Sequence, residues 1–103
     1  MDTRNSIHPD HAKKMTTDEL RQEFLVTDIM SEGKTTVTYS HIDRVMLGGI
    51  VPTDKALSLP SGDLIASEFF LEKRELGVFN IGGPGLIEVS GKKYDIDYRD
   101  CLY

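Results

Sequence analysis

The polar and apolar positions of the chain predict one short helix followed by a series of strands. Thr16-Thr17-Asp18-Glu19 has the form of a capping box, in which each of the two end residues accepts a hydrogen bond from the backbone amide of the other. Leu20 and Phe24 follow with the i, i+4 spacing of one helix face, so the pattern predicts a helix over residues 17–24. A helix this short is not stable alone, and we expect both apolar side chains to pack against another part of the protein.

After Gly33 the periodicity changes from that of a helix to that of a strand. Residues 35–40 alternate and are rich in β-branched side chains, which favours a strand. Residues 87–89 and 94–96 also alternate, and the intervening Ser90-Gly91 predicts a hairpin turn. The other apolar runs that predict strands are 45–47, closed by Gly48-Gly49, then 56–59, 65–71 and 76–81. Strand-like segments at intervals of roughly ten residues indicate an antiparallel β-sandwich or barrel.

The two ends of the chain differ from this regular pattern. Residues 1–15 are polar and are predicted to form an extended arm. The arm and the helix make up an N-terminal segment, residues 1–33, ahead of a β domain over residues 34–103. At the C-terminus, residues 100–103 begin a strand for which the sequence suggests no partner, and an open sheet edge is an aggregation hazard. We therefore expect the chain to be a fragment or one half of a larger protein.

Charge and composition exclude several classes of function. The net charge is −5, which argues against nucleic-acid binding and against docking on an anionic membrane surface. No apolar run approaches the roughly 20 residues that span a bilayer, and the polar N-terminus does not have the form of a secretory signal. The single cysteine, Cys101, makes no internal disulfide, so a cytoplasmic location is expected.

One set of spacings resembles a known metal-binding motif. The pattern Gly62-x5-Glu68-x-Phe70-x4-Glu75-x6-Gly82 matches the first motif of cupin barrels, G-x5-H-x-H-x3,4-E-x6-G, at every interval. The two histidine positions hold Glu68 and Phe70, so the metal ligands of a cupin are absent and a standalone metal-dependent cupin enzyme is disfavoured. The resemblance implies a mainly β, cupin-type antiparallel sandwich or jelly roll that is incomplete at its C-terminal edge.

Longer blocks of sequence resemble one enzyme family. The blocks are Ser6-Ile7-His8, Phe24-Leu25-Val26, the run from Tyr39 to Arg44 with Gly48-Gly49-Ile50, and the run from Phe70 to Gly83. Over essentially the whole chain they resemble the N-terminal half of the 5-keto-4-deoxyuronate isomerases, also called 4-deoxy-L-threo-5-hexosulose-uronate ketol-isomerases. The resemblance implies a bacterial, cytoplasmic, two-cupin protein more than twice this length. It implies a role in pectin degradation, where 5-dehydro-4-deoxy-D-glucuronate becomes 3-deoxy-D-glycero-2,5-hexodiulosonate.

The family resemblance also implies where the chemistry resides. Zinc in this family is bound by three histidines and a glutamate of the C-terminal cupin, and a metal of this kind stabilises an enediolate as a Lewis acid. None of those ligands lies in these residues, so we expect no catalytic residue, no metal ligand and no turnover in the chain alone. The homologous enzyme is expected to be a homo-oligomer. The alternative is a metal-free cupin that acts as an oligomerisation or sugar-binding module.

Histidine and cysteine side chains give few candidates for chemistry. His8 and His11 are spaced i, i+3, but two ligands do not complete a structural zinc site. On a strand, His41 and Asp43 would share a face, where the imidazole could act as a general base or make a structural hydrogen bond. The structural role is favoured. Cys101 lies in a strand-like run without a basic neighbour, which favours a buried small apolar side chain over a nucleophile.

Charged side chains around the cupin-like motif are the remaining candidates. Glu75 stands at the position of a metal ligand, and without histidine partners it would be a lone carboxylate that needs a cation. Lys73 and Arg74 could pair with it or with Glu72, and a structural ion pair is favoured over binding of a substrate carboxylate. Arg44 or Arg74 could bind a uronate carboxylate through two parallel hydrogen bonds, but surface pairing is more common.

Overall fold

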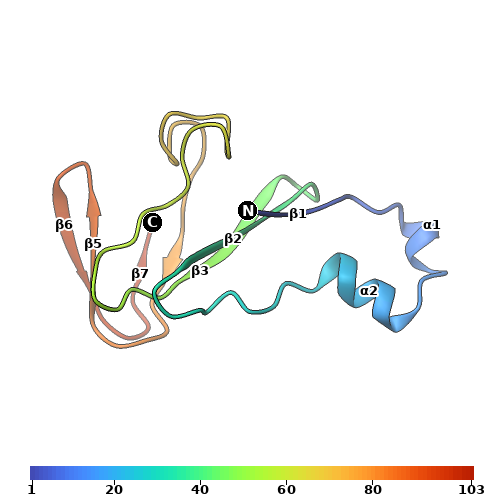
Figure 1. Ribbon diagram of the computed structural model, residues 1–103, viewed down its shortest axis with the longest axis horizontal. Coiled ribbons are helices and arrows are strands. Elements are labelled where there is room, and N and C mark those ends of the chain that lie inside the picture. Colours follow the sequence, from blue (N-terminus) through green and yellow to red (C-terminus); the bar gives the residue numbers. More distant parts are fainter. The chain divides into compact units, whose positions relative to one another are not determined.

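The computed structural model describes all residues from Met1 to Tyr103, and its regular elements are mainly strands (Figure 1). The chain forms two compact units, Met1–Pro60 and Ser61–Tyr103. Seven short strands are distributed over three small sheets, and two short helices precede most of them. The mainly β character expected from the sequence is therefore confirmed. Neither helix has the length and apolar character that crossing a membrane requires.

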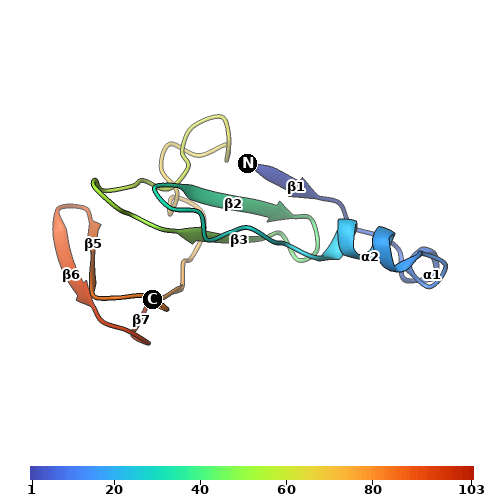
Figure 2. The ribbon, with the colours of Figure 1, turned by 60° about the horizontal axis from the view of Figure 1, so that its bottom comes forward.

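The first unit is built around a three-stranded sheet with β2 (Thr35–Ser40) at its centre (Figure 2). β3 (Val45–Ile50) runs antiparallel to β2, and β1 (Asp2–Arg4) runs parallel to the other edge of β2. The strand predicted over residues 35–40 is confirmed with the same bounds, and its central residues, Val37 and Thr38, are buried. Alternating β-branched side chains pack well on a pleated surface, which explains why this segment becomes the central strand.

Four residues, 41–44, connect β2 to β3 as a turn. Asp43 and Arg44 have positive φ angles of 55° and 54°, and the Ser40 hydroxyl accepts a hydrogen bond from the Ile42 amide at 3.1 Å. The prediction that His41 and Asp43 share one strand face is therefore wrong. The chain reverses direction at these residues, so the alternation of a strand does not apply to them.

Gly48 and Gly49 lie inside β3, whereas the sequence predicted that they end the strand. Both positions are too close to other chain segments for a side chain. A Cβ at Gly48 would meet the Thr36 carbonyl oxygen, and one at Gly49 would meet the Ile29 carbonyl oxygen and, at 2.6 Å, the Met30 sulfur. The glycines thus mark close approaches of backbone to the sheet and not a strand end.

The helix predicted over residues 17–24 is confirmed as α2 (Thr17–Phe24). Both bonds of the capping box are present: the Glu19 carboxylate accepts from the Thr16 amide at 2.7 Å, and the Thr16 hydroxyl accepts from the Glu19 amide at 3.3 Å. Leu20 is 37% exposed and Phe24 is 44% exposed, so the expectation that both pack against the protein is wrong. The helix is capped by its own polar side chains, while its apolar face is left largely uncovered.

The first 15 residues are not simply an extended arm. β1 adds a parallel edge strand to the first sheet, and α1 (Pro9–Ala12) follows. Proline is well suited to the first helical position, because its fixed φ matches a helix and no amide is needed there. The His8 side chain caps the same turn, since its Nδ1 accepts a hydrogen bond from the Asp10 amide at 3.1 Å.

The second unit contains the predicted hairpin, which is confirmed. β5 (Gly85–Val89) pairs with β6 (Lys92–Ile96), and the connecting Ser90 and Gly91 have φ angles of 50° and 78°. Two successive positive φ values give the turn that matches the twist of the flanking strands.

The last strand also has a partner, contrary to the prediction from sequence. β7 (Cys101–Leu102) runs antiparallel to β4 (Val78–Phe79), and the Asn80 amide donates to the Asp100 carbonyl at 2.9 Å. The segment 76–81 is therefore a strand over two residues only. Sequence periodicity does not reveal this pairing because the two strands lie more than twenty residues apart in the chain.

Two predicted strands are absent. Residues 56–59 form no strand, and residues 65–71 are turns and bends in which the main regular feature is an isolated bridge between Gly62 and Ser67. Within this loop Ile65 and Phe70 are buried, while Phe69 is 58% exposed. Ser67 is buried as well, so three side chains of the run are buried, at irregular spacing and in a segment whose backbone forms turns and bends.

Candidate functional site

The cupin-like motif lies in the second unit and begins as a compact loop. Arg74 stabilises this loop: its guanidinium donates to the Phe70 carbonyl at 3.1 Å and to the Ile65 carbonyl at 3.3 Å. The Arg74 Cζ also lies 5.2 Å from the centre of the Phe70 ring, within the range of a cation–π contact. Arg74 is therefore occupied in holding its own loop, and the suggested role in binding a uronate carboxylate has no support from its geometry.

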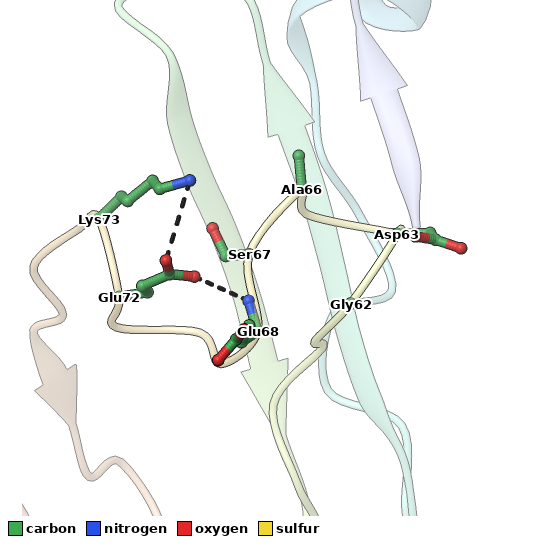
Figure 3. Close-up of a pocket in the computed structure, with 7 residues that line it drawn as sticks. All are labelled: Gly62, Asp63, Ala66, Ser67, Glu68, Glu72 and Lys73. Atoms are coloured by element: carbon green, nitrogen blue, oxygen red, sulfur yellow. Dashed lines mark hydrogen bonds and ion pairs between the residues drawn. The ribbon is translucent and has the colours of Figure 1, made fainter.

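Next to this loop is an open pocket of about 300 Å³ (Figure 3). Its seven lining residues are Gly62, Asp63, Ala66, Ser67, Glu68, Glu72 and Lys73. In Figure 3 the Glu72 carboxylate lies between the Lys73 ammonium, 3.9 Å away, and the Glu68 amide, which donates to it at 2.7 Å. Three carboxylates and one ammonium make the pocket acidic, which is unfavourable for a negatively charged sugar acid.

Glu75, which occupies the ligand position of the motif, does not pair with the cations predicted for it. Lys73 contacts Glu72, and Arg74 donates to backbone carbonyls. A hydrogen bond to the Glu75 carboxylate, followed by its negative charge, raises the pKa of Tyr103 above its ordinary value of 10.0. Of the two pairings predicted for these cations, the one with Glu72 is present, through Lys73, and the one with Glu75 is absent.

The histidines are separate from this motif in the sequence, and the side chains of two of them make structural contacts. His8 caps α1, and His11 lies in the last turn of the same helix. The His41 ring meets Tyr39 edge to face at 5.0 Å, and its backbone amide donates to the Arg4 carbonyl at 3.0 Å. The structure thus places His41, which is exposed, in the turn that follows β2 and beside Tyr39.

Arg44 and Cys101 complete the set of predicted candidates. Arg44 is exposed in the turn that follows β2. Cys101 is exposed in β7, so the prediction that it is a buried apolar side chain is wrong. The reason is the register of the ladder, which pairs Cys101 with Phe79 on the uncovered face.

Zinc, which the family resemblance implies for the homologous enzymes, finds no fit among these residues. No group of three or more His, Cys, Asp or Glu side chains lies close enough together to bind a metal ion. A tetrahedral zinc site needs about four such ligands.

Comparison with curated proteins gives a consistent result over the full chain. A 4-deoxy-L-threo-5-hexosulose-uronate ketol-isomerase from Yersinia pestis is 51% identical over 105 aligned residues. Proteins of the same name from Yersinia pseudotuberculosis and Bacillus licheniformis are 50% and 43% identical. Each alignment covers 100% of this chain. The chain is a homologue of the N-terminal portion of these ketol-isomerases.

This portion is a minor part of the isomerases. The chain spans 38% of the length of each of these relatives, so more than half of every isomerase lies outside the match. No family model matches the chain. The resemblance expected from the blocks of residues in the sequence is nevertheless confirmed by these relatives, at an identity that excludes a chance similarity of short motifs.

Proposed function

We propose that the chain is a non-catalytic part of a ketol-isomerase acting on a deoxy-hexosulose uronate. The observation that carries this proposal is the sequence identity of 43–51% to three isomerases, in alignments that cover the whole chain. In this proposal the chain supports the fold and assembly of the enzyme, and the residues that act on the substrate lie in the part of the isomerase outside the match.

The reaction needs a set of catalytic side chains that this chain does not bring close together. Exchange of a carbonyl and a neighbouring hydroxyl requires a base for the proton next to the carbonyl and a group that stabilises the enediolate charge. The charged residues of the motif are instead engaged with one another or with the backbone, as Arg74 and Glu72 illustrate. We therefore assign zinc binding and proton transfer to residues outside this chain.

Other features of the family belong to the same proposal. The second unit and part of the first would contribute strands to an N-terminal cupin over residues 34–103, with residues 1–33 as a preceding arm and helix. The completed protein would be a cytoplasmic homo-oligomer of pectin degradation that converts 5-dehydro-4-deoxy-D-glucuronate to 3-deoxy-D-glycero-2,5-hexodiulosonate. The equivalence of Gly62, Glu75 and Gly82 to cupin motif positions supports this arrangement.

A chimera tests the proposal. The matched part of the Yersinia pestis isomerase is replaced by this chain, and turnover of 5-dehydro-4-deoxy-D-glucuronate is measured. We expect the chimera to be active, while this chain alone gives no turnover. Activity of the 103-residue chain alone would show that the chemistry resides here. An inactive chimera with an intact fold would show that the chain does not serve this enzyme.

A further inference from the structure

The β4–β7 ladder of the second unit has one covered face and one bare face. Its register pairs Val78 with Leu102 and Phe79 with Cys101, and residues directly opposite each other in a ladder point to the same side. Val78 and Leu102 are half-buried, whereas Phe79 is 75% exposed and Cys101 is exposed.

The residues that follow the two strands at the same spacing are also exposed. Ile81 follows Phe79 by two positions and is 64% exposed, and Tyr103 follows Cys101 by two positions and is 83% exposed. These four residues, Phe79, Ile81, Cys101 and Tyr103, are called the Phe79 face below. Large apolar and aromatic side chains gathered in this way are a feature of surfaces that other protein segments cover.

The edges of the same ladder are also open. β4 has β7 as its single neighbour and β7 has β4, so each strand has one edge without a partner strand. An open edge presents backbone donors and acceptors to which a further strand can bind. Within this unit just three apolar side chains, Ile65, Phe70 and Ile96, are buried. A core this small rarely stabilises a unit without a disulfide, a metal or a partner.

We propose that the Phe79 face is an interface for the part of the ketol-isomerase chain that lies outside the match. This rests on the proposed function. The relatives supply a polypeptide of sufficient length, since this chain spans 38% of each of them. A second copy of this chain is disfavoured, because each copy has a net charge of −5 and association would bring like charges together.

Cys101 provides a direct probe of this face. It is the single cysteine of the chain, it is exposed, and it lies opposite Phe79. Its alkylation by iodoacetamide is followed by mass spectrometry of the peptide that contains it, so that cysteines elsewhere in the chimera do not interfere. We expect alkylation to be at least about tenfold slower in the chimera than in the isolated chain, since a covered thiol reacts when the interface opens.

Two matched substitutions locate the effect. Phe79→Asp places a charge in the proposed interface, and Leu86→Asp places one at a site in β5 that is 54% exposed. In the chimera, Phe79→Asp should restore rapid alkylation of Cys101, and Leu86→Asp should leave it slow. Far-ultraviolet circular dichroism of both variants in the isolated chain checks folding, where neither exposed side chain is needed for packing.

Three other results overturn the proposal. Equal alkylation rates in the chimera and the isolated chain would show that the Phe79 face stays uncovered, and an equal effect of Leu86→Asp would show that the face is not specific. Slow alkylation of the isolated chain with a dimer in sedimentation would identify a second copy as the partner. The proposed function is judged separately by turnover: an active chimera with a reactive Cys101 contradicts the interface alone, and an inactive chimera with a protected Cys101 contradicts the function alone.

Discussion

Replacement of Gly49 by alanine tests the close approach of residues 29–30 to β3. Gly49 is buried, and an added Cβ would lie 2.8 Å from the Ile29 carbonyl carbon and 2.6 Å from the Met30 sulfur. Carbon atoms in comfortable contact are about 3.5–4.0 Å apart. The Met30 side chain can move aside, but the Ile29 contact is with backbone, so the crossing segment or the strand must shift.

The expected cost follows from this collision. Inserting a carbon atom into a packed site typically costs about 1–3 kcal/mol, and Gly49→Ala belongs at the upper end because the obstacle is backbone. At about 0.05–0.15 kcal/mol per residue, the first unit, Met1–Pro60, has on the order of 3–9 kcal/mol of stability. The substitution should therefore remove a large fraction of the stability of this unit.

Urea unfolding followed by circular dichroism, together with amide hydrogen exchange of β2 and β3, measures this effect. Gly77→Ala is the matched control, because nothing lies within 4 Å of its added Cβ and its φ is not positive. That change should be neutral or should stabilise by about 0.4–1 kcal/mol. If Gly49→Ala costs no more than Gly77→Ala and leaves exchange in β3 unchanged, then residues 29–30 do not cross the strand at Gly49.

Three further predictions concern single side chains. Thr16→Ala should destabilise α2 by about 1 kcal/mol and reduce its helical NMR shifts, while the control Thr17→Ala should not. An equal loss of helix stability in the two variants would contradict a cap at Thr16. Arg74→Lys should lower the stability of the second unit by about 1–3 kcal/mol, since an ammonium cannot donate to two carbonyls in the same fork; an unchanged urea midpoint would refute this. Glu75→Gln should lower the pKa of Tyr103 toward 10.0 in tyrosine ¹³C NMR titrations. Because the pKa of Tyr103 is raised in the folded chain, its interaction with Glu75 stabilises the fold below pH 10, and this contribution is lost as the pH rises through the raised pKa. A Tyr103 titration that is unaffected by Glu75→Gln would show that the interaction does not form.

Local signals in the sequence determined a substantial part of this fold. The capping box predicted α2 with its observed bounds, because both of its hydrogen bonds join residues three apart. Ser90-Gly91 predicted the hairpin, since two successive positive φ angles suit those residues and bring adjacent segments together. The long blocks of residues likewise indicated the resemblance to the N-terminal portion of the isomerases, which the identities over the whole chain confirm.

Other features depend on contacts between distant residues, and the tertiary structure decided them. β1 pairs with β2 across more than thirty residues, and β4 pairs with β7 across more than twenty, so no local pattern specifies either partner. The apolar run of residues 65–71 has enough hydrophobic side chains for a strand, but Arg74 binds two of its carbonyls and holds it as a loop. The candidate site likewise depends on residues distant in the sequence, because the Glu75 carboxylate raises the pKa of Tyr103, while Lys73 contacts Glu72 and Arg74 donates to backbone carbonyls. Sequence periodicity indicates which positions are apolar. It does not indicate that Cys101 and Phe79 are exposed together, because this depends on the pairing of β4 with β7, two segments that are distant in the sequence.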